Sequence, residues 1–402
     1  MIQYTCQLAF DSDLPAELEK IYEFFNVVLS YGHLPNQFDN LSLVVVVVCN
    51  GMNKKNLFGI CQKIMRNLLG THLGFACLRT LMHIIEDQTN YTEPALIRGA
   101  VYFLVHSLWG DFHTKKATLS PNTVLPAFKN LLENEQIASP CIFLEICNGI
   151  HMFLMSVINP TKNANKLLQR RPSLMPEDLP EITEIVTEWT WNLVLDVCHN
   201  LVYSMIVKED ELKDNKELVS MIQLLIEALK DLLSQVLSVN DFAENEQMSN
   251  DYVSLLLLMN EDFISRLFDI IQRGINYLSS ESILKLISYR FKYITENLTV
   301  IPNRDWFSEL DHLMTDFFSQ SNLSTDIRKQ FLLQMQQFLS TNSSYISSDA
   351  FFSKVAKNHF SSSPNQNRSS EIGISFLLYF VKELNVPENL AQIIALFIKA
   401  SI

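Results

Sequence analysis

Cysteine and histidine are the side chains of this sequence that could bind a metal or act as nucleophiles, and their spacing argues against both roles. Cys141 and Cys147 lie six residues apart in one predicted helix, which rotates their side chains by about 240° onto different faces. Metal ligands on one helix are typically four residues apart. Cys198 and His199 are adjacent, so they do not face each other on a helix. We interpret these cysteines as buried core residues.

Three further histidines, His72, His83 and His106, fall in or at the start of separate predicted helices. No carboxylate spacing completes a ligand set with them. The sequence also lacks the glycine-rich motifs that bind nucleotide phosphates and the His-Glu-x-x-His motif of zinc proteases. We therefore predict no catalytic, cofactor-binding or metal-binding residue in this chain, and no enzymatic activity.

A basic, proline-containing segment over residues 159–180 lies between two predicted helices. Its positive charges are Lys162, Lys166, Arg170 and Arg171, and no acidic residue lies among them. One interpretation is a contact for an acidic partner or an anionic lipid. The simpler interpretation, which so few charges favour, is a solvated insertion between helices.

Trp189 and Trp191 could form an aromatic contact for a partner. Two residues apart on a helix, they point about 200° away from each other, so one faces the core and one faces outward. Trp189 recurs with apolar residues at steps of three and four, which leaves Trp191 as the outward residue. Tryptophan is frequent among residues that dominate binding energy, so we predict Trp191 to bind a partner. Partial burial against a neighbouring helix is the alternative.

The elements that carry these residues are predicted to be helices. Glycine accounts for only 10 of the 402 residues, and strands, tight turns and phosphate-binding loops all need glycine. Hydrophobic residues amount to 48% and charged residues to 19%, which argues against a disordered chain. A net charge of −13 with no dominant basic stripe argues against nucleic-acid binding.

Apolar residues recur at steps of three and four along most of the chain, which places them on one face of successive helices. Even the valine-rich run Leu43–Cys49 is better explained as a buried helix than as a strand. Helix pairs of roughly 40–50 residues are typical of HEAT and armadillo-like repeats, so we predict an all-α, right-handed solenoid. An irregular helical bundle is the alternative. The predicted pairs are 14–31 with 36–49, 54–69 with 71–86, 94–109 with 121–133, 139–158 with 181–207, 215–238 with 251–277, 279–297 with 303–320, 324–340 with 347–359, and 371–384 with 388–402.

We predict one extended solenoid, with helical repeats over 1–158, the basic segment over 159–180 and further repeats over 181–402. The last apolar helix, Leu390–Ile398, has no polar cap, so we expect the chain to be part of a longer protein. No apolar run reaches the roughly 20 residues of a membrane span, and no transmembrane segment is predicted. Seven cysteines without a Cys-x-x-Cys pair indicate reduced thiols in the cytosol or nucleus.

Several stretches resemble, in the same order, the amino-terminal helical region of the tuberin family, the large subunits of the tuberous sclerosis complex. The resemblance extends over about residues 31–385 and is weakest at 159–180, where this chain carries an insertion. The matching stretches are Cys61-Gln-Lys-Ile-Met-Arg-Asn-Leu-Leu-Gly-Thr-His-Leu-Gly74, Ala95-Leu-Ile-Arg-Gly-Ala-Val-Tyr-Phe103, Leu108-Trp-Gly110, Ser120-Pro-Asn-Thr-Val-Leu-Pro-Ala-Phe128 and Ser280-Glu-Ser-Ile-Leu-Lys-Leu-Ile-Ser-Tyr-Arg290.

The resemblance implies a HEAT-like solenoid that binds the coiled coil of a hamartin-type partner. Tuberin-family proteins activate GTP hydrolysis by the small GTPase Rheb and so restrain target-of-rapamycin (TOR) signalling. Their activating domain lies near the far carboxyl end of a much longer chain, and nothing in this sequence resembles it. The resemblance therefore carries over no catalytic residue. It implies a non-catalytic, cytoplasmic scaffold that reaches the lysosomal surface peripherally, as part of the complex.

Arg66 and Arg98 are the charged residues within otherwise apolar matching stretches, and we name both as candidate partner-binding residues. A charge embedded in an apolar helix usually needs an internal counterion, so we favour ion pairs inside the solenoid for both. Gly70 and Gly74 are predicted to permit close approach of the backbone at a tight turn between helices.

Two other classes of protein compete with a coiled-coil scaffold. An importin-like adaptor is also acidic and helical, but it would need tryptophan and asparagine at regularly repeated inner positions, and four scattered tryptophans do not supply them. An enzyme would need polar groups that converge in a pocket, and the spacing reveals none. The sequence therefore predicts a protein-binding scaffold, with an importin-like or other HEAT-repeat adaptor as the second reading.

Overall fold

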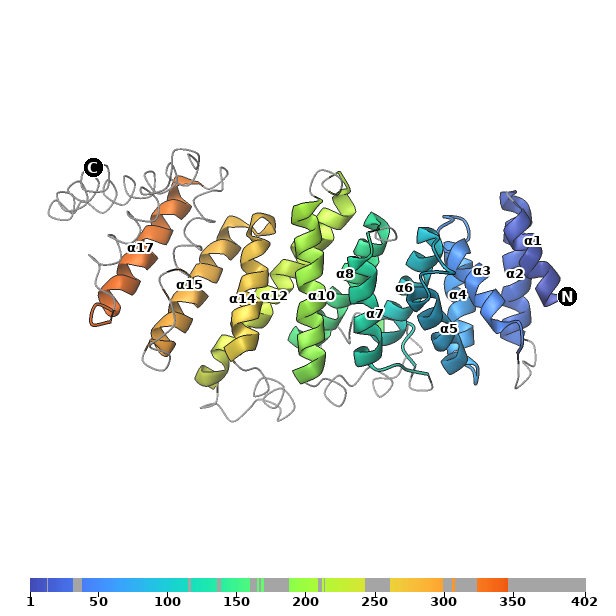
Figure 1. The fold of residues 1–402 in the computed structure, drawn as a ribbon, viewed down its shortest axis with the longest axis horizontal. Coiled ribbons are helices and arrows are strands. Elements are labelled where there is room, and N and C mark those ends of the chain that lie inside the picture. Colours follow the sequence, from blue (N-terminus) through green and yellow to red (C-terminus); the bar gives the residue numbers. More distant parts are fainter. Residues whose placement is uncertain are drawn as a thin grey trace. The chain divides into compact units, whose positions relative to one another are not determined.

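A computed structural model describes residues 1–345 with gaps at 13, 32–37, 115–116 and 136–138, over most of 160–187, 209–213 and 299–323, and at 243–260. The described residues fold into α-helices and one short 3₁₀ helix, without a strand (Figure 1). The chain divides into two compact units, Met1–Ile270 and Ile271–Ile402. The elements are α1 (Ile2–Asp11), α2 (Pro15–Tyr31), α3 (Leu41–Gly51), α4 (Phe58–Leu69), α5 (Gly74–Glu86), α6 (Pro94–Leu108), α7 (Pro121–Glu133), α8 (Pro140–Ile158), α10 (Glu188–Val207), α12 (Lys216–Phe242), α14 (Glu261–Arg273), η2 (Ile275–Tyr277), α15 (Ser280–Asn297) and α17 (Thr325–Thr341).

The prediction of an all-α, solenoid-type fold is confirmed, and the boundaries of most described helices agree with the apolar period to within a few residues. The valine-rich run forms the buried helix α3, as predicted. The prediction missed α1, because only Cys6 of that helix is buried and its sequence shows no apolar stripe. The helices predicted at 347–359, 371–384 and 388–402 lie outside the described residues, as does most of 303–320.

Proline and serine mark several helix starts. Proline, which has no N–H to leave unpaired there, is the first residue of α2, α6, α7 and α8. Ser120 caps α7 by accepting a hydrogen bond from the Asn122 N–H at 3.3 Å. Ser279 caps α15 in the same way, accepting from the Ser282 N–H at 3.2 Å.

Helices of the first unit pack mainly on helices beyond their immediate neighbour in sequence, which places them in two rows. One row contains α3, α6, α8 and α12 in succession, and the other contains α5, α7 and α10. Contacts such as those of α5 with α6 and of α8 with α10 join the rows. Simple pairs of sequential helices, as predicted, therefore describe the packing only in part. Stacking along the rows buries apolar faces that a single pair would leave exposed.

Close approach between helices explains two glycines. A Cβ atom on Gly99 of α6 would collide with the carbonyl oxygen of Cys49 in α3, so only glycine lets these helices meet there. A Cβ on Gly74 would lie 2.5 Å from the Leu69 carbonyl oxygen, which confirms the prediction for that residue. The prediction for Gly70 is wrong, because its φ is −77° and a Cβ atom would meet its nearest neighbour at an ordinary 3.4 Å.

Helix α8 is long and apolar enough to cross a membrane by length and composition, unlike the other helices in the described part of the chain. However, 67% of its most apolar window is buried among other helices, and the core helix of a helical domain passes the same test. The helix also contains Glu145, a carboxylate buried in contact with a neighbouring helix. These features are those of a central packing helix.

In the second unit, α15 packs against α17. The rings of Phe291 and Phe338 stack with their centroids 4.7 Å apart. Asn342, which follows α17, donates a hydrogen bond from Nδ2 to Thr295 Oγ1 at 3.0 Å. The pair of helices is thus held by one aromatic stack and one polar contact near the same ends.

Candidate partner-binding surface

Arg66, a candidate partner-binding residue on α4, has its counterion inside the fold. Its guanidinium lies 3.0 Å from Asp111 Oδ2 in the turn that follows α6, and it covers the ring of Phe112 at 4.8 Å from the centroid. The other oxygen of Asp111 lies 2.9 Å from His106 Nδ1. Arg66 therefore joins α4 to α6 and its following turn, in the structural role that the sequence favoured.

Neighbouring groups stabilise the charged form of the Asp111 carboxyl group. Burial raises the pKa of its carboxyl group, but the hydrogen bond from His106 and the charges of His106 and Arg66 outweigh burial, so the pKa lies below its ordinary value. A lowered pKa means that the folded protein stabilises the charged form. The Arg66–Asp111–His106 cluster is therefore a stabilising clamp.

Arg98, the second candidate, joins three elements. Its Nε and a terminal nitrogen both approach Glu145 Oε1 of α8 at 3.0 Å, and its other terminal nitrogen donates to Asn53 Oδ1 at 3.4 Å. Asn53 in turn donates to the Ala95 carbonyl oxygen at 2.7 Å. Arg98 thus ties α6 to α8 and to the turn after α3. A direct role of either arginine in partner binding stays a prediction.

The surroundings of Glu145 stabilise its charged form less than the surroundings of Asp111 do. Burial raises the pKa of its carboxyl group above the ordinary value, and the attraction of Arg98 only partly offsets that effect. Both nitrogens of Arg98 approach the same oxygen, and the negative charge of Glu217 on α12 raises the pKa further. Burial, and not the absence of a counterion, is therefore the main cause of the raised pKa of Glu145.

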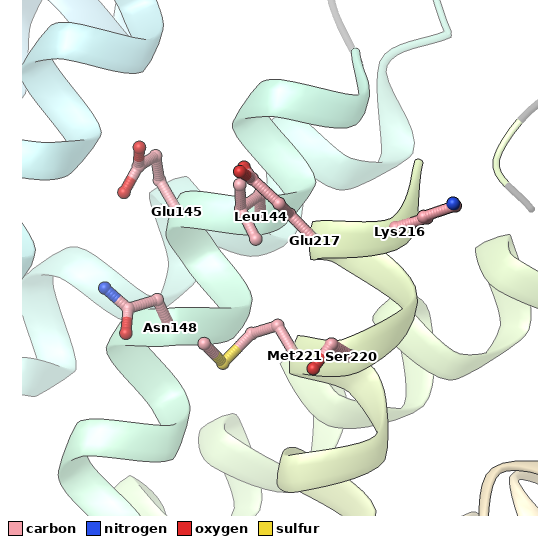
Figure 2. Close-up of a pocket in the computed structure, with 7 residues that line it drawn as sticks. All are labelled: Leu144, Glu145, Asn148, Lys216, Glu217, Ser220 and Met221. Carbon is pink, nitrogen blue, oxygen red and sulfur yellow. The ribbon is translucent and has the colours of Figure 1, made fainter. Parts of the chain in front are cut away.

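A cleft opens between α8 and α12 beside this carboxylate (Figure 2). Its volume is about 500 Å³. In Figure 2 the Met221 side chain extends from α12 towards Asn148 of α8, whereas Lys216 points away from Glu145 and Asn148. The lining combines apolar, acidic, basic and neutral polar residues: Leu144, Glu145, Asn148, Lys216, Glu217, Ser220 and Met221.

Sequence reasoning did not predict this cleft. It singled out only Arg98, the counterion of the lining residue Glu145. Its two walls come from segments about 70 residues apart in the sequence, and nothing local indicates that α8 and α12 become neighbours. The usable signal is the outward stripe on each helix, where Leu144 and Asn148, and Glu217 and Met221, recur at four-residue spacing.

The prediction that Trp191 faces outward is wrong. Its side chain is 1% exposed and packs between Phe153 and Phe263, with ring centroids 5.2 Å and 5.8 Å away. Trp189 is the outward residue, at 62% exposure. The buried face of α10 is broad: it includes Leu193 and Val197, which share the three-and-four spacing with Trp189, as well as Trp191 and Val194. The error was to place Trp189 on that face and Trp191 outside it. Trp191 is a core residue and cannot contact a partner in this fold.

The basic residues Lys162, Lys166, Arg170 and Arg171 lie outside the described residues, so both interpretations of that segment stay open. Within the described residues, no group of three or more histidine, cysteine, aspartate or glutamate side chains could hold a metal ion. Six of the seven cysteines are buried and Cys141 is half-buried.

A family model matches residues 1–335, which is most of the chain. It describes a domain of unknown function, DUF3384. The chain belongs to this family. DUF3384 is in general associated with the amino-terminal region of tuberin, which agrees with the region that the sequence motifs resemble. In this member of the family, the stacked helices leave a cleft between α8 and α12.

Proposed function

We propose that this chain is the non-catalytic helical scaffold region of a tuberin-like GTPase-activating protein. In this role it binds a hamartin-type coiled coil and supports Rheb inactivation, and thereby negative regulation of TOR signalling, through an activating domain that this sequence does not contain. The complex operates in the cytoplasm and at the lysosomal surface, with peripheral membrane recruitment. The match of DUF3384 to residues 1–335 carries this proposal.

The stacking of the helices supports a scaffold role. Alternate helices pack in two rows, so their outward stripes form long surfaces on which a helix of a partner can lie. Ion pairs between helices, such as Arg66–Asp111 and Arg98–Glu145, fix neighbouring helices in register. A partner that spans several helices then binds a preformed surface, so little conformational entropy of the scaffold is lost on binding.

No reaction is proposed for this chain. The α8–α12 cleft offers two carboxylates, an amide, a hydroxyl and the amine of Lys216, and among these described residues no hydrogen bond pairs a nucleophile with a base. The buried thiols have raised pKa values, about 12 for Cys61 and for Cys77 through burial, which keeps them protonated and unreactive near neutral pH.

The proposal is tested with purified full chain and a hamartin coiled-coil segment, by co-purification and by calorimetric titration. We expect a complex with a defined stoichiometry. Absence of binding by the folded chain would overturn the proposal. In parallel, Rheb loaded with GTP should hydrolyse it at its intrinsic rate in the presence of this chain alone, and stimulation would contradict the non-catalytic assignment.

The same titration with a variant lacking 159–180 tests the basic segment. An unchanged affinity is expected if the segment is a solvated insertion. Anionic vesicles provide the second arm: lipid contact predicts that replacing Lys162, Lys166, Arg170 and Arg171 with alanine lowers vesicle binding, whereas an insertion predicts no change.

A further inference from the structure

Exposed large apolar side chains gather in the first fourteen residues. Met1, Tyr4 and Leu14 are 88%, 69% and 60% exposed, and Leu8 and Phe10 are exposed as well. The remaining exposed large apolar residues of the described chain are spread over residues 27–345. Apolar side chains that occur singly on a surface need no explanation, whereas a cluster of them marks an interaction site.

One stripe of α1 carries most of this cluster. The helix packs mainly against α2 and α3, and Cys6 is its buried residue. Tyr4 and Leu8 each lie two residues from Cys6, so both point about 200° away from it. Met1, Tyr4, Leu8 and Asp11 follow at steps of three and four, which places them on one side of the helix. The outward side of α1 is therefore an apolar stripe that ends in one carboxylate.

Charged side chains are absent from most of this stripe. Residues 1–10 contain no Asp, Glu, Lys or Arg, although the whole chain has a net charge of −13. A net charge of this size makes copies of a protein repel each other. Two carboxylates lie at the carboxyl end of α1: Asp11 accepts a hydrogen bond from Gln7, and Glu17 accepts one from Ser12, which follows the helix. These charges oppose the approach of a second copy at one end of α1 only.

The stripe is self-complementary in the antiparallel direction. A twofold axis level with Cys6 places Tyr4 of each copy opposite Leu8 of the other. It also places Asp11 of each copy at the amino end of the other helix, where the helix dipole stabilises a negative charge. A parallel pair would instead bring Asp11 and Glu17 next to the same residues of the second copy, where like charges repel. The charges therefore select the antiparallel pair.

We propose that the outward stripe of α1 binds a second copy of this chain, with the two α1 helices packed antiparallel and Tyr4 against Leu8. A partner that is recognised by charge would find no counterion along residues 1–10, whereas a second copy supplies a matching apolar stripe. Helix α1 has ten residues and is about 15 Å long, so the contact is smaller than the roughly 1,200 Å² of a stable interface. The dimer is therefore weak and reversible, and it forms independently of a hamartin-type coiled coil.

Sedimentation velocity with the full chain tests the dimer. The weight-average mass should rise from that of the 46.2 kDa monomer towards twice that value between roughly 1 and 300 µM, the range that a small interface supports. A mass that stays at the monomer value throughout would overturn the proposal. Growth beyond the dimer would overturn it too, because a twofold contact closes with two copies.

Charge substitutions locate the contact. Tyr4→Glu with Leu8→Glu alters only exposed side chains and places carboxylates along both paired stripes, so it should weaken self-association at least about tenfold. Phe75→Glu, at an exposed apolar residue of α5, is the matched control and should leave self-association unchanged. Circular dichroism confirms folding. Self-association that survives in the first variant, or that the control abolishes, would contradict the assignment to α1.

Cysteine cross-linking tests the antiparallel order without adding charge, and it keeps the test decisive if the glutamate variant unfolds. A mixture of Tyr4→Cys and Leu8→Cys chains should form intermolecular disulfides at least about fivefold faster than either variant alone, because only the mixed pair lies directly opposite. The wild type measures the background from the native thiols, six of which are buried. Faster linking of either variant alone would indicate another arrangement and overturn the proposal.

Other occupants of the stripe give distinct results. If the wild type stays monomeric and binds lipid vesicles through Tyr4 and Leu8, the stripe belongs to a membrane surface. If the wild type stays monomeric and the glutamate variant loses the hamartin coiled coil, the stripe belongs to that partner. Either result overturns the proposal. A dimer that forms as expected in a chain that does not bind hamartin would overturn only the proposed function.

Discussion

Two arginine–carboxylate pairs of the first unit look alike in sequence but differ in how the fold supports the carboxylate. One carboxylate oxygen of Asp111 contacts Arg66 and the other contacts His106, and the pKa of this carboxyl group is lowered. Two nitrogens of Arg98 contact the same carboxylate oxygen of Glu145. Burial raises the pKa of this carboxyl group, and the negative charge of Glu217 raises it further. The same charge pattern thus produces a pair in which the charged carboxylate is favoured, at Asp111, and a pair in which burial disfavours it, at Glu145.

The difference separates a charge that stabilises the fold from one that the fold holds at a cost in stability. A charge that the fold fully supports contributes to stability and has no need of a partner. A buried carboxylate whose charge the fold supports poorly reduces stability, and such groups concentrate at functional sites. The four changes below probe this comparison in order of decreasing expected effect.

Arg98→Ala should give the largest effect, a loss of about 3 kcal/mol in the free energy of unfolding at pH 7, because it leaves Glu145 buried without its counterion. Denaturant titration at pH 7 and at pH 5 measures it. The loss should shrink at the lower pH, where Glu145 accepts a proton more easily. Adding Glu145→Gln to Arg98→Ala should restore much of the stability. A loss that the second change leaves untouched would show that packing, and not the carboxylate, is responsible.

Arg66→Ala should cost less, about 1–2 kcal/mol, because Asp111 keeps its contact with His106. Part of the loss comes from the contact with the Phe112 ring. Thermal denaturation measures it, with Arg79→Ala at an exposed position of α5 as a matched control that should leave the melting temperature unchanged. If Arg66→Ala melts at the wild-type temperature, the Arg66–Asp111 pair does not stabilise the fold.

Asp111→Asn should cost about 1 kcal/mol at neutral pH, with a defined pH dependence. The pKa of Asp111 is lower in the folded than in the unfolded protein, so the charged carboxylate stabilises the fold above the unfolded value. That contribution disappears as the pH falls through the folded pKa. The free energies of unfolding of wild type and variant should therefore converge only when the pH falls below the folded pKa of Asp111. Parallel curves would contradict the assignment.

Glu145→Gln should give the smallest effect, with the opposite sign: unchanged stability or a gain of up to about 1 kcal/mol at pH 7. The folded pKa is raised, so the charged form is penalised above it, and the penalty is relieved as the pH falls towards the unfolded value. The advantage of the variant should therefore vanish in acid. A clear loss at pH 7 would place Glu145 in the same class as Asp111.

Much of the fold could be predicted from local signals. The apolar period located most described helices, and the prolines that begin α7 and α8 are a further start signal that is local in the sequence. Helix α1 escaped because it buries only Cys6, and the pairing of helices was incomplete because stacking along rows depends on contacts between distant segments. The sequence identified Gly74 as a close-approach residue but not Gly99, whose neighbour Cys49 lies 50 residues earlier.

The candidate site was predicted less well. Arg66 and Arg98 stood out as charges in apolar helices, and the internal counterions favoured for them are present. Trp191 was misassigned because the apolar face of α10 is broad, and a two-residue step cannot decide which tryptophan it buries. The cleft was missed because its walls, around Leu144 and Met221, become adjacent only when α8 and α12 stack.

One titration tests the central claim, that this chain is a binding scaffold in which Arg66 has a structural role. A hamartin coiled-coil segment is titrated calorimetrically into wild type and Arg66→Ala, each below its melting temperature. The account predicts a complex with the wild type and near-wild-type affinity for folded Arg66→Ala. No binding by the folded wild type, or lost binding in a folded Arg66→Ala variant, would contradict it.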